Sequence, residues 1–186
     1  GLFTVTKKNG DQRLILDARM SNCHFAEPEH VHLATGDTFG RIEASKGDRP
    51  VCVGGVDIAV AFYAIENPPE LQDLFALDPV KAGEVDVSTV EGRPVKPGES
   101  IFPVFTAVPM GWTQALWICQ QVLEHNVEVA GVPSATRFRD GEPVPHMSKF
   151  IHTAYADNFV VLSQSLRVSR EVATRVSAQL QKAGLP

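Results

Sequence analysis

The sequence predicts an α+β fold, and three observations support this prediction. β-prone runs and stretches of helical spacing follow one another along the chain without the regular alternation of an α/β protein. A hydrophobic fraction of 44% and a charged fraction of 21% are ordinary for a globular chain. A length of 186 residues suffices to bury a core, as one domain or as one domain with a lobe.

The first predicted element is a β-hairpin. Residues 2–6 and 13–17 are β-prone, and Asn9-Gly10 between them is the strongest short hairpin signal. Residues 23–50 are predicted to be loops with short elements.

The middle of the chain contains a predicted buried strand at 51–56, followed by the start of a helix at 59–65. After a Pro-Pro break, residues 70–77 are predicted to form a short helix. Residues 78–100 are rich in Asp, Glu, Gly and Pro and predict a surface excursion.

Strands and helices alternate irregularly in the rest of the sequence. An amphipathic helix from Leu166 to Leu180 closes the chain and ends before Gly184. The elements before it are a strand at 101–108, a helix at 112–128, a loop at 131–148, and two strands at 151–156 and 159–163 joined at Asp157-Asn158.

Two acidic residues stand at the ends of apolar strands. The strand at 51–56 leads to Asp57, and the strand at 151–156 leads to Asp157. A carboxylate in such a position is costly unless a positive charge meets it. Two of them on different strands suit a pair of Mg²⁺ ions, although a capping or ion-paired Asp at each strand end is the simpler alternative.

The charge and the cysteines narrow the class of protein. A net charge of −5 by itself argues against a nucleic-acid binder, but basic groups outnumber acidic ones in residues 1–22 and 137–186. These ends could face an anion or could simply be solvated faces. Three cysteines do not suit a disulfide scaffold, which favours a reducing intracellular compartment, cytoplasm or nucleus. No apolar run reaches the roughly 18 residues of a membrane helix.

Several segments together resemble the reverse transcriptases, the RNA-directed DNA polymerases of retroelements. The resemblance follows the family's order of motifs across nearly the whole chain. The matching segments are Phe3–Arg19 with Asn22 (fingers hairpin), Asp57–Phe62 (motif A), Pro109–Trp112 with Ala115 and Gln120 (motif B), Tyr155-Ala156-Asp157-Asn158 (motif C, usually Tyr-x-Asp-Asp), and Lys182–Leu185 (approach to motif D).

The resemblance implies a right-hand polymerase fragment with fingers and palm, an antiparallel palm sheet packed on helices. Its reaction would be DNA synthesis from dNTPs on an RNA or DNA template, extending a DNA primer. Asp57, Asp157 and the Ile58 carbonyl would hold two Mg²⁺ or Mn²⁺ ions, the clamp used for in-line phosphoryl transfer.

The resemblance also implies roles for residues around the metals. Lys7 or Lys8, with Arg13, would grip the triphosphate, and the spacing does not decide between the lysines. Phe62 would exclude a ribose 2′-hydroxyl. The remaining matches are Met110 and Gly111 below the nucleotide, and Asp17, Arg19, Gln120, Tyr155 and Asn158 as template, primer or supporting residues.

The resemblance divides the chain into regions. Residues 1–50 would be the fingers hairpin and connecting loops, 51–66 palm, 67–105 a fingers-side excursion and 106–186 palm. A thumb and a ribonuclease H segment, which a longer polyprotein would supply, are not expected here.

Two alternatives remain open at this stage. Asn158 replaces the usual second Asp of motif C, which leaves room for a catalytically decayed copy. Separately, Cys23, His24, His30 and His32 could form a zinc site in a structural module, although their spacing matches no common zinc finger.

Overall fold

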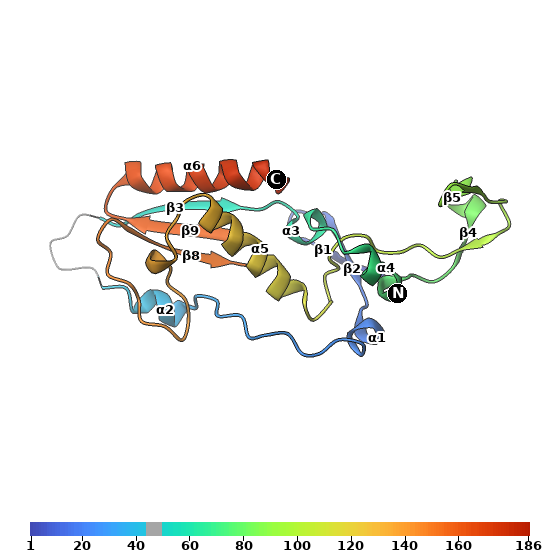
Figure 1. The fold of residues 1–186 in the computed structure, drawn as a ribbon, viewed down its shortest axis with the longest axis horizontal. Helices are drawn as coiled ribbons and strands as arrows, with labels where there is room; N and C mark the ends of the chain where they lie inside the picture. The colour runs from blue at the N-terminus through green and yellow to red at the C-terminus, as the bar shows by residue number, and fades with distance from the viewer. Residues whose placement is uncertain (44–49) are drawn as a thin grey trace. The chain divides into compact units, whose positions relative to one another are not determined.

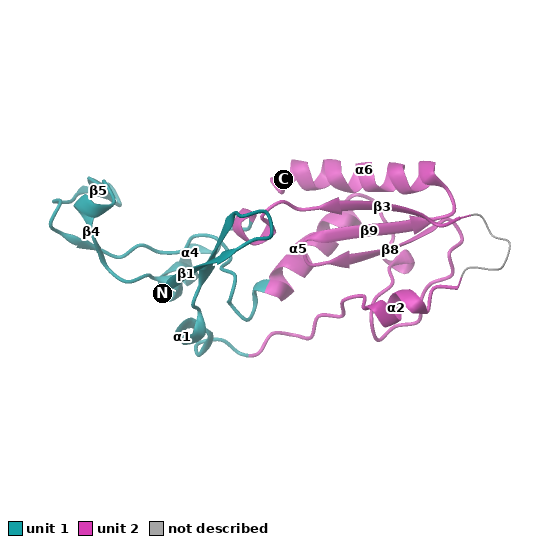
Figure 2. Ribbon diagram, turned by 180° about the vertical axis from the view of Figure 1, so that it is seen from behind, with its two compact units in different colours: residues 1–26, 65–115 teal, residues 27–64, 116–186 magenta. Residues whose placement is uncertain are grey.

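The computed structural model describes residues 1–43 and 50–186, so part of the predicted loop at 23–50 lies outside the described residues. The chain divides into two compact units, which are described separately (Figure 2). Unit 1 contains residues 1–26 and 65–115, and unit 2 contains residues 27–64 and 116–186. The fingers and palm assignments remain predictions.

Unit 1 begins with the predicted hairpin. Strands β1 (Leu2–Thr6) and β2 (Gln12–Leu16) pair antiparallel, from Leu2 opposite Leu16 to Thr6 opposite Gln12. Gly10 has φ +90° in the turn, a conformation that glycine adopts without steric cost. The Asn-Gly signal therefore located the turn correctly.

The rest of unit 1 consists of short elements. The predicted strand at 101–108 is wrong over most of its length, because only Ser100–Ile101 (β7) forms a strand there, paired with Val80–Lys81 (β4). Pro103, which has no N–H to donate to a ladder, follows directly. The other elements are α1 (Arg19–Asn22), α4 (Pro69–Gln72), the 3-10 turns η1 (Asp73–Phe75) and η2 (Ala82–Glu84), β5 (Thr89–Val90) and β6 (Arg93–Pro94).

Unit 2 is built on a three-stranded antiparallel sheet (Figure 1). The strand order is β3 (Cys52–Asp57), β9 (Asn158–Ser163) and β8 (Phe150–Tyr155). Two long helices accompany it, α5 (Ala115–Val129) and α6 (Leu166–Lys182). Shorter elements are α2 (Gly36–Gly40), α3 (Ala61–Ala64) and the 3-10 turn η3 (Ser134–Thr136). These elements confirm the α+β prediction.

Side-chain alternation gives the sheet two different faces. Cys52, Gly54 and Val56 face α6, and a Cβ added at Gly54 would come 2.9 Å from the Ser169 carbonyl oxygen. Glycine at this position therefore permits close contact between β3 and α6. On the opposite face, Asp57 lies at the end of the strand and is exposed.

At the other end of the second face, Ile151 of β8 and Leu162 of β9 form a cluster with Ala34 and Phe138. Among the described helices, none has the length and apolar character that a membrane span requires. All three cysteines are free thiols.

Candidate functional site

The two predicted catalytic aspartates are neighbours in unit 2. Asp57 ends β3 and stands directly opposite Asn158, the first residue of β9. The Ile58 N–H donates to the Asp157 carbonyl oxygen at 2.8 Å, so the chain segments carrying both carboxylates are joined by a backbone hydrogen bond. The fold therefore brings together two acidic residues that are separated by 100 positions in the sequence.

Asp157 lies in the tight turn between β8 and β9. The turn residues are Ala156 and Asp157, because Tyr155 and Asn158 are already paired across it. The predicted junction at Asp157-Asn158 is thus wrong by one residue. Ala156 has φ +53°, a left-handed conformation at the first of two turn positions, where hairpins commonly have glycine.

Asn158 makes a direct contact with the predicted metal ligand. Its Nδ2 donates to Asp157 Oδ1 at 2.7 Å. An Asp in this position would place a second carboxylate beside Asp157 and opposite Asp57. The neutral amide instead donates a hydrogen bond to Asp157 and adds no negative charge.

The side chain of Gln120 in α5 forms hydrogen bonds to the turn between β8 and β9. Its Oε1 accepts from the Ala156 N–H at 2.8 Å, and its Nε2 donates to the Ala154 carbonyl oxygen at 3.1 Å. The side chain is 2% exposed. The contacts in the structure make Gln120 a support for the turn, and a template contact has no observation behind it.

Cys119, beside Gln120, is also buried in this region. Its burial, and secondarily the negative charge of Asp157, raise the pKa of the thiol to about 12. Cys119 is therefore a neutral packing residue rather than a thiolate ligand.

The segment after Asp57 contains a second strained position. Val60 has φ +50°, which is rare for a β-branched residue. Phe62, the predicted sugar-selecting residue, lies just beyond it in α3 and is half-buried. Such backbone strain is typical of functional sites, and here it occurs within three residues of each predicted metal-ligand aspartate.

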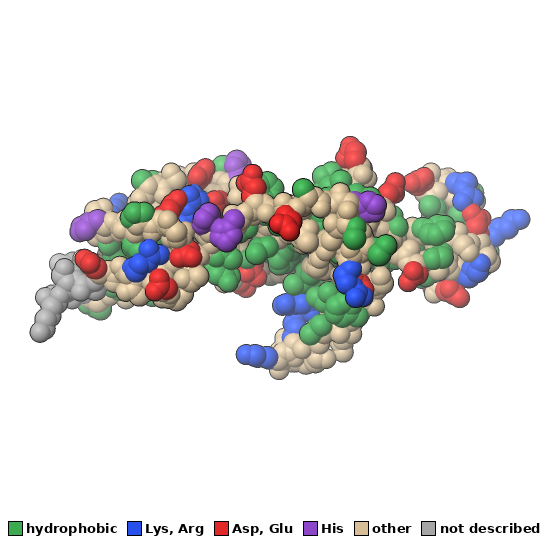
Figure 3. Space-filling model, turned by 90° about the horizontal axis from the view of Figure 1, so that it is seen from below, with side chains coloured by type: hydrophobic (Ala, Val, Ile, Leu, Met, Phe, Trp, Pro, Cys, Tyr) green, Lys and Arg blue, Asp and Glu red, His purple; other side chains and the backbone are tan. Residues whose placement is uncertain are grey.

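Unit 1 contains the predicted triphosphate-binding residues. A shallow hollow of about 440 Å³ is lined by Lys7, Lys8 and Arg13 together with Val5, Thr6 and Asn9. Arg13 pairs with Val5 across the hairpin, and Lys7 directly follows the end of β1. Basic side chains gather at the end of the hairpin beyond the exposed apolar side chains of its strands (Figure 3).

Gly111 has a structural reason to be glycine. Its φ is +109°, and an added Cβ would come 2.6 Å from the Leu16 carbonyl oxygen. The close backbone approach in the structure is thus to β2, within unit 1. Met110, the preceding residue, is half-buried.

Asn22 forms hydrogen bonds to the segment around Gly111, a role that the sequence did not reveal. Its Nδ2 donates to the Gly111 carbonyl oxygen at 3.0 Å, and its Oδ1 accepts from the Thr113 N–H at 3.0 Å. The only signal in the sequence was its position after the hairpin in the family resemblance.

Asp17 and Arg19 pair with each other. The Arg19 guanidinium donates to both Asp17 carboxylate oxygens, at 2.8 Å and 2.6 Å. This hydrogen bonding lowers the pKa of Asp17 to about 2. The pair lies directly after the end of β2, and contact with a template remains a prediction.

The alternative zinc site finds no support in the described part of the chain. There no three His, Cys, Asp or Glu side chains, including Cys23, His24, His30 and His32, form a group that could hold a metal. His30 and His32 do contact each other edge to face, with ring centroids 4.6 Å apart.

The Asp57–Asp157 end of the sheet fits Mg²⁺ or Mn²⁺ better than zinc. Its carboxylate oxygens are hard ligands of the kind that Mg²⁺ prefers, whereas zinc favours thiolate and imidazole ligands. Asp57 is also exposed, so an ion could reach it.

The comparison with solved structures finds a similarity of fold. No protein-family model matches the chain, and no curated protein matches it. A solved structure of the foamy viral protease-reverse transcriptase, in complex with double-stranded DNA, is similar in fold with a TM-score of 0.62 and 15% sequence identity. The match covers 99% of this chain and 25% of that one, so this chain spans about a quarter of the foamy viral chain.

Proposed function

We propose that this chain is the fingers and palm portion of an RNA-directed DNA polymerase. The observation that carries the proposal is the placement of Asp57 and Asp157 side by side at one end of the antiparallel sheet. The similarity in fold to a reverse transcriptase bound to duplex DNA supports the same class of reaction.

In the proposed mechanism, Asp57, Asp157 and the Ile58 carbonyl would hold two Mg²⁺ or Mn²⁺ ions. These ions would supply activation of the primer 3′-oxygen and neutralisation of charge on the pyrophosphate that leaves. The turn holding Asp157 is fixed by Gln120 before any metal binds, which lowers the cost of forming the site.

The hairpin residues would bind the triphosphate of the incoming nucleotide. Arg13 can donate a planar pair of hydrogen bonds, and a lysine adds a point charge. The hollow that Arg13 shares with Lys7 and Lys8 supports this assignment for either lysine. Phe62 would lie below the sugar and favour dNTP over NTP.

The test is incorporation of a single dNTP into a primer–template duplex, at low salt with the protein in excess and either Mg²⁺ or Mn²⁺. We expect Asp57→Asn and Asp157→Asn each to abolish incorporation, because each removes charge from the metal site. The matched control is Asp37→Asn, which removes an exposed carboxylate from α2 and should leave the rate unchanged.

Full incorporation by either variant would refute the metal-ligand assignment. The chain without a thumb is expected to be a poor polymerase, so a chain that incorporates nothing with either metal even when joined to a thumb segment would instead favour a decayed polymerase-like domain.

A further inference from the structure

A series of hydrogen-bonded and ion-paired side chains in unit 2 connects the turn that carries Asp157 to strand β8. Gln120 Nε2, besides contacting Ala154, donates to Glu124 Oε1 at 2.7 Å. Glu124 Oε2 forms an ion pair with Arg137 Nη1. The two side chains are only 16% and 17% exposed, so the pair is largely shielded from water.

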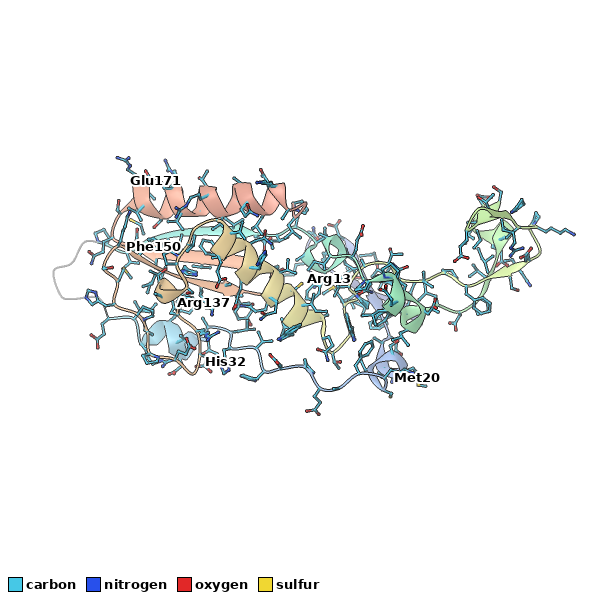
Figure 4. The ribbon with its side chains drawn as sticks, in the orientation of Figure 1. Arg13, Met20, His32, Arg137, Phe150 and Glu171 are labelled. Atoms are coloured by element: carbon cyan, nitrogen blue, oxygen red, sulfur yellow. The ribbon has the colours of Figure 1, made fainter. Side chains whose placement is uncertain are left out.

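Arg137 is in turn anchored to β8. It forms a parallel bridge with His152, and the next residue, Phe138, donates its N–H to the His152 carbonyl oxygen at 2.8 Å. Figure 4 shows Arg137 beside α5 in the segment that follows η3. The connection therefore starts at β8, passes through Arg137, Glu124 and Gln120, and ends at the turn after β8.

This connection determines which way the Gln120 amide points. Its Nε2 lies between two acceptors, the Ala154 carbonyl and the Glu124 carboxylate. In that orientation Oε1 faces the Ala156 N–H, which needs an acceptor. The flipped amide would face two acceptors with its oxygen and an N–H donor with its NH₂ group, losing all three hydrogen bonds.

The ion pair with Arg137 holds the Glu124 carboxylate where it accepts from Gln120 Nε2. A shielded carboxylate without its cation would be costly, and it would turn toward water. A displaced Glu124 would no longer accept from Gln120 Nε2.

We infer that Glu124 and Arg137 are positioning residues for Asp157, acting through Gln120 on the strained turn at Ala156. The catalytic part of this inference rests on the proposed function, but the positioning part is a property of the metal-free chain. The Glu124 carboxylate connects to the turn through the Gln120 amide, and Arg137 is also joined to β8 through the His152 bridge.

The test measures hydrogen exchange of individual backbone amides by NMR in the metal-free protein. Glu124→Ala should raise the exchange rate of the Ala156 amide at least about tenfold, while the Val161 amide in the centre of the sheet keeps its parent rate. Glu124→Gln retains an acceptor for Gln120 and should restore most of the protection. Glu171→Ala removes an acid from an exposed Arg167–Glu171 pair in the same unit and should change neither amide.

Unchanged exchange at Ala156 in Glu124→Ala would overturn the inference. An equal rise at Ala156 and Val161 would also overturn it, because that result reports general destabilisation. In nucleotide incorporation, Glu124→Ala should need severalfold more Mg²⁺ for its half-maximal rate. A parent chain without activity even when joined to a thumb segment would count against the proposed function while leaving the exchange result intact.

Discussion

Asp57 and Asn158 stand directly opposite each other across β3 and β9, and Asn158 also donates a hydrogen bond to Asp157 at 2.7 Å. One amide therefore contacts or faces both predicted metal ligands. The fold accommodates the departure from Tyr-x-Asp-Asp without changing the length or pairing of the turn. The effect of Asn158 is consequently one of charge.

This arrangement predicts the consequence of Asn158→Asp. Without metal, the new carboxylate would face Asp57 and lose the hydrogen bond to Asp157, at a cost of about 1 kcal/mol. With metal, the extra charge would favour binding. We expect a lower Tm than the parent in EDTA and a larger rise in Tm on adding Mg²⁺, with half-maximal incorporation at lower Mg²⁺.

The control for this variant is Gln164→Glu, which adds a negative charge to an exposed loop of unit 2. It should shift neither the Tm in EDTA nor the response to Mg²⁺. If Asn158→Asp responded to Mg²⁺ no more than the parent does, Asn158 would not be a missing electrostatic contributor.

His152 predicts a pH dependence of stability. It is 1% exposed, and its Nδ1 lies 3.0 Å from Thr136 Oγ1, whose hydroxyl donates to Pro133. Burial, and secondarily the charge of Arg137, lower its pKa from 6.5 to about 4. Between these two pKa values, His152 is protonated in the unfolded chain and neutral in the folded chain. Stability therefore falls as pH drops below about 6.5 and continues to fall until about pH 4.

The expected loss from this residue is about 2 kcal/mol between pH 7 and pH 5. His152→Asn retains a donor for Thr136 but does not titrate. Urea unfolding at the two pH values should therefore show a smaller loss for His152→Asn than for the parent. Equal losses would mean that His152 titrates normally in the folded chain.

Gly111 predicts a strong local effect in unit 1. An alanine there would adopt φ +109° and place its Cβ 2.6 Å from the Leu16 carbonyl oxygen. We expect Gly111→Ala to lower the free energy of unfolding by about 2–5 kcal/mol. Gly98→Ala, where the added Cβ meets nothing within 4 Å, should change it by no more than about 0.5 kcal/mol. Similar unfolding midpoints for both variants would contradict the close approach.

Phe62 predicts selection of the sugar if the proposed function holds. Phe62→Ala should remove bulk below the ribose and raise NTP incorporation relative to dNTP. The measurement is the ratio of the two incorporation efficiencies. An unchanged ratio in an active variant would make Phe62 a packing residue of α3.

The sequence predicted those elements whose signals are local. The hairpin followed from Asn9-Gly10, and α6 followed from the spacing of Val172, Val176 and Leu180, all buried in the structure. The prediction of a strand at 101–108 was wrong because it followed the apolar residues of this segment and neglected Pro103. Position 101 pairs with β4, while beyond Pro103 only isolated bridges form at Val104 and Ala107.

The candidate site was predictable in part. The strand ends at Asp57 and Asp157 were visible as acids closing apolar runs, but their adjacency depends on pairing between distant strands. The Gln120, Glu124 and Arg137 connection could not be predicted, because it depends on how α5 packs against β8. Asn22 was equally hidden, since its partners lie about 90 residues away.

The central claim is that Asp57 and Asp157 together bind a divalent metal. The most direct measurement is a Mn²⁺ titration of the chain followed by paramagnetic broadening of its backbone amide NMR signals. We predict that the amides of Ile58 and Asn158 broaden first and that Asp157→Asn abolishes this effect. Broadening centred elsewhere, such as on the acidic segment at 70–99, with Ile58 and Asn158 unaffected, would contradict the account.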